Sequence, residues 1–272
     1  MTALAHRRPR KDPPPDPEGI FDTAGAIALF SARLTRALPQ TRHYVAETLR
    51  QAAIIVTGST AVILAIAFFA GGSCGLESSA LARAFGAAPI AGGFSSWCTL
   101  REVIPFVFGY IVAAKIGCGM VAELASMRAA EEIDQLDGMG IHSLAYLAGT
   151  RAIAAAITLP FAYVLSIASG YAAAALMSLG RFGDVSPGTW KLFFLTFQDS
   201  SDLLYSVLKG LTISAFIVLV ALHQGYGLRA RGPVDVGVAT ARSMAISIVG
   251  VTMISMAGTL IFWGANPRIP IG

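Results

Sequence analysis

Three long runs without a charged residue limit what this chain can fold into. They cover residues 52–70, 152–180 and 243–263. A helix needs about 20 apolar residues to cross the hydrocarbon core of a bilayer, and each run reaches or approaches that length. A soluble domain would not stay soluble with so little charge, because only 13% of the residues are charged, against roughly 25% in soluble proteins. The runs therefore predict an all-α integral membrane protein.

Two further apolar runs have charges inside them or at their edges. Residues 203–222 contain Lys209, and residues 103–114 lie between Glu102 and Lys115. The shorter run spans a membrane only if its flanking charges sit at membrane depth or snorkel to the interface. With these two runs, the sequence predicts five transmembrane helices.

Glycine and proline mark the expected ends and breaks of these spans. Gly71 and Gly72 are expected to end the first span and to begin a loop of small residues over 71–98. The third run is longer than one span requires, so Pro160 is expected to kink it and Gly170 to divide it.

The segment before the first span has two parts. Residues 1–19 are rich in proline and arginine, which predicts a disordered basic tail. Residues 20–51 are predicted to form an interfacial helix followed by an elbow helix. The first of these places apolar side chains on one side with Arg33 and Arg36 elsewhere, and is expected to end at Pro39. A soluble helix packed on a partner is the alternative for this segment.

The distribution of lysine and arginine predicts the orientation of the chain. With a cytoplasmic N-terminus, the segments 1–51, 115–151 and 223–242 face inward and hold fourteen of the twenty basic residues, while the outer segments hold four. The predicted transmembrane domain covers residues 52–263, and the positive-inside rule, applied to a plasma (inner) membrane, places its N-terminal side in the cytoplasm. Residues 264–272 then form an extracytoplasmic tail. The net charge of +4 follows this topology and indicates lipid headgroups rather than nucleic acid as the partner.

A polar stretch between the second and third spans, residues 117–141, contains five of the sixteen acidic residues. Apolar residues from Met120 to Leu136 recur every three or four positions, which predicts one stripe of a single helix that Gly138 and Gly140 stop. Carboxylates do not enter hydrocarbon cheaply, so this helix must lie at a membrane face, and the predicted topology makes that face cytoplasmic. The acids are Glu123, Glu131, Glu132, Asp134 and Asp137.

Four charges at the edge of the spans or inside them form a candidate site. They are Arg101, Glu102, Asp202 and Lys209. Asp202 and Lys209 are two helical turns apart on one face, and ionisable residues inside a membrane usually face a cavity or a partner. Both pairs belong to the outer half of the membrane, so we expect them to meet across one site. The alternative is that only Lys209 is embedded and the other three are interfacial.

Motifs for catalysis or metal binding are weak or absent in the sequence. Residues 71–75 fit G-x-S-x-G, but a membrane helix precedes them where a nucleophile elbow requires a strand. The sequence has no P-loop, and its four histidines have no metal-ligand spacing. No catalytic or metal-binding residue is therefore predicted. Cys74 and Cys98 both fall on the outer side, where a disulfide and two free thiols are equally compatible with the sequence.

One long pattern resembles a known signature. It comprises Leu100-Arg101-Glu102 with Pro105, Gly117 and Gly119, the motif A-E-L-x-x-M-R-x-x-E-E-I-D over 122–134, Met139-Gly140-Ile141, Arg151, and the Asp202/Lys209 pair. Together with Gly225-Tyr226 and the segment 232–240, the pattern is similar to the MlaE/YrbE family of ABC-transporter permeases, the membrane subunits of MCE lipid-transport systems. Departures are Lys115, Asp235 and Val238, where that family often has Arg, Gly and a basic residue.

The resemblance implies a function. This chain would be the permease subunit of an ATP-driven transporter that moves lipids or fatty acids between the plasma membrane and an extracytoplasmic tube of MCE proteins. It would pair with a related but different permease and contact a cytoplasmic ABC ATPase dimer, which binds ATP and Mg, so that this chain itself needs no cofactor. Arg101, Glu102, Asp202 and Lys209 would line the substrate path. The ATPase-coupling residues would be Glu123, Met127, Arg128, Glu131, Glu132, Asp134, Asp137 and Met139.

Two other functions fit the membrane topology. An ion-coupled secondary transporter would use the embedded charges, although such folds are often built from internal repeats and none is visible here. A non-transporting membrane anchor for MCE proteins would tolerate neutral residues at the same positions.

Overall fold

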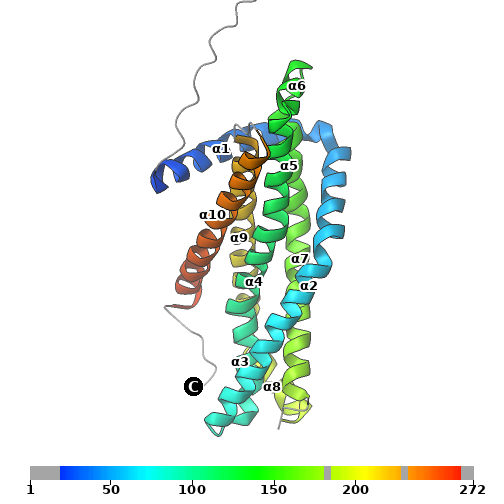
Figure 1. The fold of residues 1–272 in the computed structure, drawn as a ribbon. Helices are drawn as coiled ribbons and strands as arrows, with labels where there is room; N and C mark the ends of the chain where they lie inside the picture. Colours follow the sequence, from blue (N-terminus) through cyan, green and yellow to red (C-terminus); the bar gives the residue numbers. More distant parts are fainter. Residues whose placement is uncertain (1–18, 181–184, 228–231, 265–272) are drawn as a thin grey trace, which may run out of the picture.

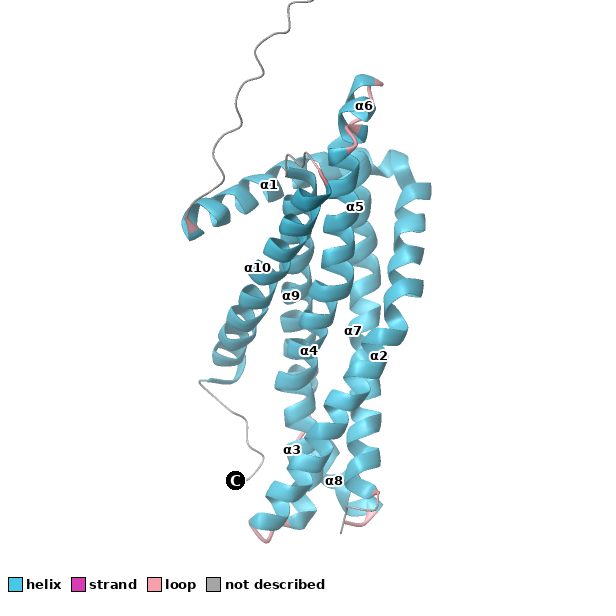
Figure 2. Cartoon of the chain, in the orientation of Figure 1, coloured by secondary structure: helices cyan, strands magenta, loops and turns pink. Residues whose placement is uncertain are grey.

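A computed structural model describes residues 19–180, 185–227 and 232–264 of the chain. All regular elements in these ranges are helical (Figures 1 and 2), so the all-α prediction is confirmed. The predicted N-terminal tail, except Gly19, and the predicted C-terminal tail, except Gly264, lie outside the described residues.

Five helical segments are long and apolar enough to cross a membrane, as predicted: Phe21–Ala84, Ala88–Ala129, Leu144–Leu179, Ser200–Gly227 and Pro233–Gly264. Their α-helices are α1 (Ile20–Thr41), α2 (Val45–Ala84), α3 (Ala91–Trp97), α4 (Ile104–Ile111), α5 (Cys118–Ala129), α6 (Glu132–Gly138), α7 (Thr150–Leu179), α8 (Pro187–Thr196), α9 (Ser200–Gly227) and α10 (Pro233–Thr259). Short 3-10 turns, η1 (Arg42–Tyr44) and η2 (Ala88–Ile90), and π-helical segments, η3 (Cys98–Val103), η4 (Val112–Gly117), η5 (Leu144–Gly149) and η6 (Leu260–Gly264), connect them. The chain is therefore a multi-pass membrane protein.

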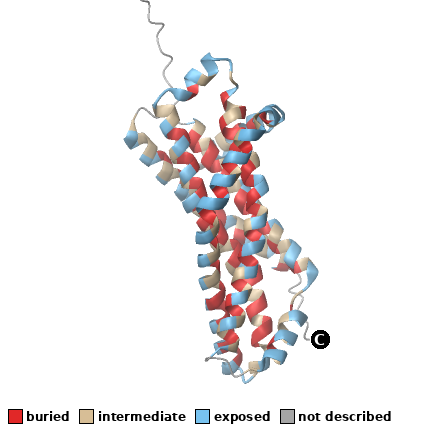
Figure 3. Ribbon diagram, turned by 90° about the vertical axis from the view of Figure 1, so that its right-hand side faces the viewer, coloured by how far each residue is buried: buried red, intermediate tan, exposed pale blue. Residues whose placement is uncertain are grey.

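The long helices form an elongated bundle with two distinct ends (Figure 1). One end carries α1 and α6, and we call it the α6 end. The other carries α3 and α8, and we call it the α8 end. Buried residues run along the interior of the bundle from one end to the other (Figure 3), where side chains of α4, α7 and α9 meet. Phe108 and Tyr163, for example, pack edge to face with their ring centroids 5.1 Å apart.

The amphipathic helix predicted before the first span is present as α1, which lies across the α6 end of the bundle (Figure 1). Phe30, Leu34 and Ala37 on one side are buried, whereas Arg33 and Arg36 are exposed. This burial agrees with the predicted stripe. The placement of α1 in the membrane interface stays a prediction.

The predicted end of α1 at Pro39 is wrong. Pro39 lies inside the last turn, and the helix continues to Thr41. The Thr41 hydroxyl is fully buried and donates a hydrogen bond to the carbonyl of Ala145 in η5, at 3.3 Å. This contact attaches the last turn to the bundle, so the turn stays helical beyond the proline.

The first span does not end at Gly71 and Gly72. Helix α2 continues to Ala84, so most of the loop predicted over 71–98 is helical. The reason is a close crossing with α7: a Cβ on Gly71 would overlap the backbone of Gly170. Small residues let membrane helices approach closely. The same crossing explains why Gly170 does not divide α7, which also continues through Pro160.

The second span is longer than the predicted run of 103–114. Helical segments follow one another from Ala88 to Ala129, with π-helical turns on both sides of α4. Arg101, Glu102 and Lys115 therefore lie within one continuous helical segment. These three charges, which made the span look too short in the sequence, are part of the second membrane-spanning segment itself.

The single helix predicted over 117–141 is wrong, because it is broken in two. Helix α5 ends at Ala129, Glu131 takes a left-handed conformation with φ 59°, and α6 starts at Glu132. The break turns Ile133 inward, where it is fully buried. The predicted stop is confirmed, since α6 ends at Gly138.

Candidate functional site

The candidate charges of the second span lie on the π-helical segment η3. π-helical turns displace the regular backbone hydrogen bonds and occur frequently at functional sites. Here two carbonyls of η3 accept hydrogen bonds from α9 side chains. Leu100 O accepts from the Ser206 hydroxyl at 2.6 Å, and Arg101 O accepts from Lys209 Nζ at 2.9 Å. These two hydrogen bonds thus hold α9 against the π-helical turn of the second span.

Arg101 and Asp202 form an almost fully buried ion pair. Arg101 Nη2 lies 2.6 Å from Asp202 Oδ2, and the two side chains are only 10% and 1% exposed. The indole N–H of Trp263 donates to the other carboxylate oxygen at 2.8 Å. The guanidinium also lies over the ring of Trp97, 4.3 Å from its centroid, in cation–π geometry. Each polar group of this pair therefore has partners, as a buried charge requires.

Lys209 and Glu102 form the second pair of the cluster. Lys209 Nζ lies 3.1 Å from Glu102 Oε2 and donates to the Thr259 hydroxyl at 2.8 Å. The Thr259 hydroxyl in turn contacts the other oxygen of Glu102. The lysine side chain is fully buried, whereas the glutamate side chain is 48% exposed. Glu102 is therefore the member of the cluster that a ligand can reach from outside the chain.

All four predicted site residues are brought together, as the sequence led us to expect. The ion pairs run between helices, Arg101 with Asp202 and Glu102 with Lys209, because residues two turns apart on α9 are separated by about 10 Å. Arg101 and Asp202 are buried within the chain as Lys209 is, and the depth of the four residues in the membrane stays a prediction. We call these four residues the charge cluster. Their role in a substrate path stays a prediction.

Three partners of the charge cluster were missed in the sequence: Trp97, Thr259 and Trp263. A signal for two of them is visible in retrospect. Thr259 and Trp263 are one helical turn apart near the end of the last apolar run, so they share a face, and both have polar atoms that need partners in a membrane. Trp97 has no comparable signal, because it reaches the cluster only through the helical turn that precedes η3.

The predicted coupling residues divide into two groups, of which the first forms internal contacts. Glu123 pairs with the buried Arg151 at 2.6 Å. Arg128 bridges the break between α5 and α6, because it pairs with Asp134 at 2.9 Å and donates to the carbonyl of Tyr226 at 3.0 Å. These contacts fix α5 and α6 to α7 and α9.

Asp137 extends the internal group, since it accepts a hydrogen bond from the backbone N–H of Ser143 at 3.1 Å. The second group comprises the remaining residues, and exposure does not distinguish it, because Glu123, Asp134 and Asp137 are exposed as well. Glu131, Glu132 and Met139 are exposed, and Met127 is partly buried. Helix α6 projects beyond the bundle (Figure 1), so its outer side is accessible to another protein. We call Glu131, Glu132 and Met139 the α6 face.

The two cysteines that the sequence left open form a disulfide. Cys74 of α2 is bonded to Cys98 at the start of η3, with their Cα atoms 5.8 Å apart. The bond ties α2 to the turn that carries Arg101. Cys118 is a free thiol. The G-x-S-x-G match does not form a nucleophile elbow, because Ser73 lies inside α2 and donates to the carbonyl of Phe69 at 3.2 Å.

Metal-binding clusters are not found in the described residues, where no three His, Cys, Asp or Glu side chains are placed to hold an ion. The charge cluster itself consists of two ion pairs. Such a site offers a cation and an anion to a polar group inside otherwise apolar surroundings.

Comparison with known proteins gives consistent matches. The model of the family called permease MlaE matches residues 48–261. The intermembrane phospholipid transport system permease protein MlaE of Haemophilus influenzae is 26% identical over 240 residues, which cover 88% of this chain and 90% of that protein. A probable ABC transporter permease protein of Rickettsia prowazekii is 25% identical over 84% of this chain and 87% of its own length. The chloroplastic protein TRIGALACTOSYLDIACYLGLYCEROL 1 of Arabidopsis thaliana is 25% identical over 65% of this chain and 51% of its own length.

Proposed function

The chain belongs to the MlaE permease family, and from this premise we propose that it is the permease subunit of an ATP-driven lipid transporter. It moves lipid or fatty-acid substrates between the membrane and extracytoplasmic MCE proteins. The name of the Haemophilus relative, a phospholipid transport permease, supports the substrate class.

The observation that carries the proposal is the charge cluster. Apolar walls accommodate acyl chains but exclude a polar headgroup, because its desolvation is costly without compensating partners. Paired charges inside the membrane-spanning helices offset that cost. Glu102 and Lys209 supply an anion and a cation at the point where the cluster is half exposed. They are the residues that we assign to headgroup passage.

Glu102→Gln tests this role. The substitution removes the charge but keeps an oxygen that can accept from Lys209, which also donates to the carbonyl of Arg101 and to Thr259, so the complex should assemble normally. Lipid transport should fall at least about tenfold, the effect of losing one charge-assisted hydrogen bond. The measurement is transfer of a labelled phospholipid by the reconstituted complex, with Glu77→Gln, an exposed carboxylate of α2, as the control.

Full transport by Glu102→Gln at normal complex levels would remove the charge cluster from the substrate path. Transport that continues without ATP and follows an ion gradient would instead favour a secondary transporter. A complex that assembles but moves no lipid under any condition would favour a membrane anchor.

We place the α6 end in the cytoplasm and the α8 end outside. The distribution of basic residues supports this orientation, and so does the Cys74–Cys98 disulfide near the α8 end, since disulfides persist in oxidising compartments. In this arrangement the α6 end contacts a cytoplasmic ATPase dimer, which binds ATP and Mg. MCE proteins meet the α8 end, and a second, related permease completes the membrane unit.

Among the predicted coupling residues, those of the α6 face are the ones that we expect to contact the ATPase. Glu132→Lys reverses a charge on this exposed face and should lower ATPase recovery in a pull-down at least about fivefold, because like charges across an interface are unfavourable. Glu77→Lys, at the far end of α2, is the matched control. Unchanged ATPase recovery with folded Glu132→Lys protein would show that the ATPase binds elsewhere. Asp134 is unsuited to this test, because its pair with Arg128 is internal.

A further inference from the structure

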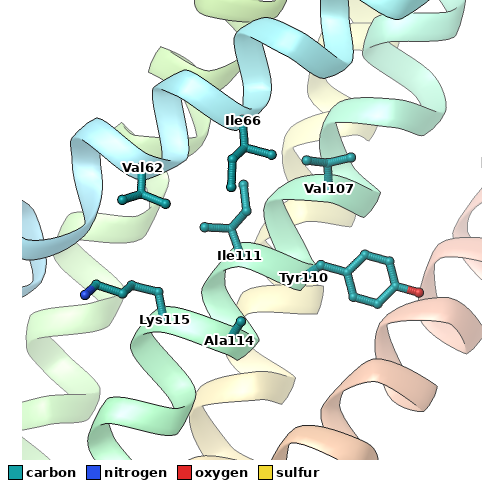
Figure 4. Close-up of a pocket in the computed structure, with 7 residues that line it drawn as sticks. All are labelled: Val62, Ile66, Val107, Tyr110, Ile111, Ala114 and Lys115. Carbon is teal, nitrogen blue, oxygen red and sulfur yellow. The ribbon is translucent and has the colours of Figure 1, made fainter.

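A groove of about 520 Å³ lies between α2 and the second span, and its lining is apolar except at one end. It is lined by Val62, Ile66, Val107, Tyr110, Ile111, Ala114 and Lys115 (Figure 4). The aminoalkyl chain of Lys115 extends beneath Val62, while Tyr110 points the other way, toward α10. The volume is within the range of roughly 300–1,000 Å³ that is usual for ligand sites.

Lys115 differs from three other cations of the membrane-spanning helices. Arg101, Arg151 and Lys209 each have a carboxylate oxygen within 3.1 Å. Lys115 has no ion pair or hydrogen bond within the described part of the chain, and it is exposed. The end of an otherwise apolar groove therefore carries a cation that no described side chain neutralises.

One wall of the groove lies midway along the apolar stretch of α2. Val62 and Ile66 are about midway along α2 between Arg50 and Glu77, the charges that flank its apolar stretch. At 1.5 Å per residue these flanking charges are roughly 40 Å apart, close to the full thickness of a bilayer with its headgroups. Lys115 itself lies closer to the α6 end, because it is seventeen residues beyond Cys98, whereas Arg50 is twenty-four residues before Cys74, to which Cys98 is bonded. At 1.5 Å per residue the lysine is roughly 10 Å from the level of Arg50, so its four-carbon stem can reach the headgroup layer at that end.

We propose that this groove binds one acyl chain of an anionic phospholipid whose phosphate lies against the Lys115 ammonium. A phosphate pairs well with a lysine as a point charge, and an acyl chain matches the apolar lining. A second copy of this chain fits less well. Its Glu102 and Asp202 are already paired, and the runs 52–70 and 243–263 contain no acid to neutralise Lys115.

In the proposed transporter, this site would bind anionic lipids selectively during their passage. That transport role rests on the proposed function. Lys115 lies thirteen residues from Glu102 in the same membrane-spanning segment, which corresponds to roughly 20 Å along its helix axis. A headgroup that passes from the α6 end to the α8 end would meet Lys115 before it meets the charge cluster. Lipid binding at Lys115 itself does not require ATP or partner proteins.

The test is lipid retention by the purified full-length protein. The protein is equilibrated in mixed micelles with equal amounts of phosphatidylglycerol and phosphatidylcholine, and the retained lipid is counted by native mass spectrometry. We expect wild type to prefer phosphatidylglycerol about fivefold, the usual contribution of one basic residue to anionic-lipid binding. Lys115→Gln should remove that preference and Lys115→Arg should keep it. Lys191→Gln, an exposed lysine of α8 outside the groove, should leave it unchanged.

A second variant tests binding of the acyl chain separately from binding of the phosphate. Ala114→Phe fills the groove and should lower retention of both lipids while Lys115 is still present. An unaltered phosphatidylglycerol preference in Lys115→Gln would overturn the proposal. So would normal retention in Ala114→Phe together with loss of a copurifying second permease, which would make the groove a protein interface. Retention is measured without the ATPase, so the two proposals are tested independently. A negative retention result does not contradict the proposed transport function, and a negative transport result does not contradict lipid binding at Lys115.

Discussion

Asp202→Ala is expected to lower the free energy of unfolding by about 3–5 kcal/mol, the typical effect of removing one partner from a buried ion pair. The loss is large because two buried donors depend on this carboxylate. Arg101 approaches one oxygen at 2.6 Å, and the Trp263 indole N–H donates to the other at 2.8 Å. Without Asp202, the guanidinium has no counter-charge within the buried part of the cluster.

A double-mutant cycle tests whether the pair accounts for this loss. Arg101→Met combined with Asp202→Ala removes both charges, and the double variant should lose clearly less stability than the sum of the losses in the two single variants. Thermal unfolding of the purified protein, followed by tryptophan fluorescence, provides the measurement. Glu77→Ala removes an exposed carboxylate and should change stability by less than about 0.5 kcal/mol. Additive effects of the two single substitutions would contradict the pairing.

The two ion pairs of the charge cluster therefore have different expected roles. Arg101 and Asp202 are closed off from solvent and hold the second span, α9 and η6 together. Glu102 is half exposed, so the pair with Lys209 can open without exposing the first pair. Substitutions in the first pair should mainly affect folding, and substitutions in the second should mainly affect transport. Four charges that look equivalent in the sequence thus form two pairs that differ in solvent exposure.

The number and approximate positions of the spans were predictable, because the requirement for an apolar run about as long as the bilayer is thick is local in sequence. The members of the charge cluster were predictable for a similar reason, since few charges are tolerated in such runs. Their pairing was not. Which acid meets Arg101 depends on the π-helical turn of η3 and on how α9 docks against it, and neither property is local.

The break between α5 and α6 could not be predicted from periodicity either. The apolar spacing continues through Ala130, yet Glu131 leaves the helical conformation and Ala130 is exposed. The alternative geometry is stabilised by contacts with distant residues, among them Arg128 with the carbonyl of Tyr226. The same rearrangement pairs Asp134 with Arg128 and brings Asp137 to the backbone N–H of Ser143, although both acids stay exposed, so the coupling surface that we propose is the α6 face.

The predicted helix ends at Gly71 and Gly72 are wrong for a physical reason. In a soluble helix a glycine weakens the structure, but in a membrane-spanning helix it permits close packing of backbones. Gly71 and Gly75 are one turn apart on α2 and face Gly170 and Ala174, also one turn apart, on α7. A sequence shows the glycine without showing whether another helix crosses it.

Gly71→Val should therefore destabilise the protein strongly, whereas Gly58→Val should not. Both glycines lie in α2, but a Cβ at Gly71 overlaps the Gly170 backbone, and a Cβ at Gly58 meets nothing within 4 Å. Backbone at Gly170 cannot rotate aside as a flexible side chain would, so α2 and α7 must separate and lose the neighbouring contact of Gly75 with Ala174. We expect a loss of about 3 kcal/mol at Gly71, the upper end for overpacked cores, and less than about 0.5 kcal/mol at Gly58. Thermal unfolding in detergent measures both, and equal unfolding temperatures for the two variants would show that α2 and α7 do not cross at these glycines.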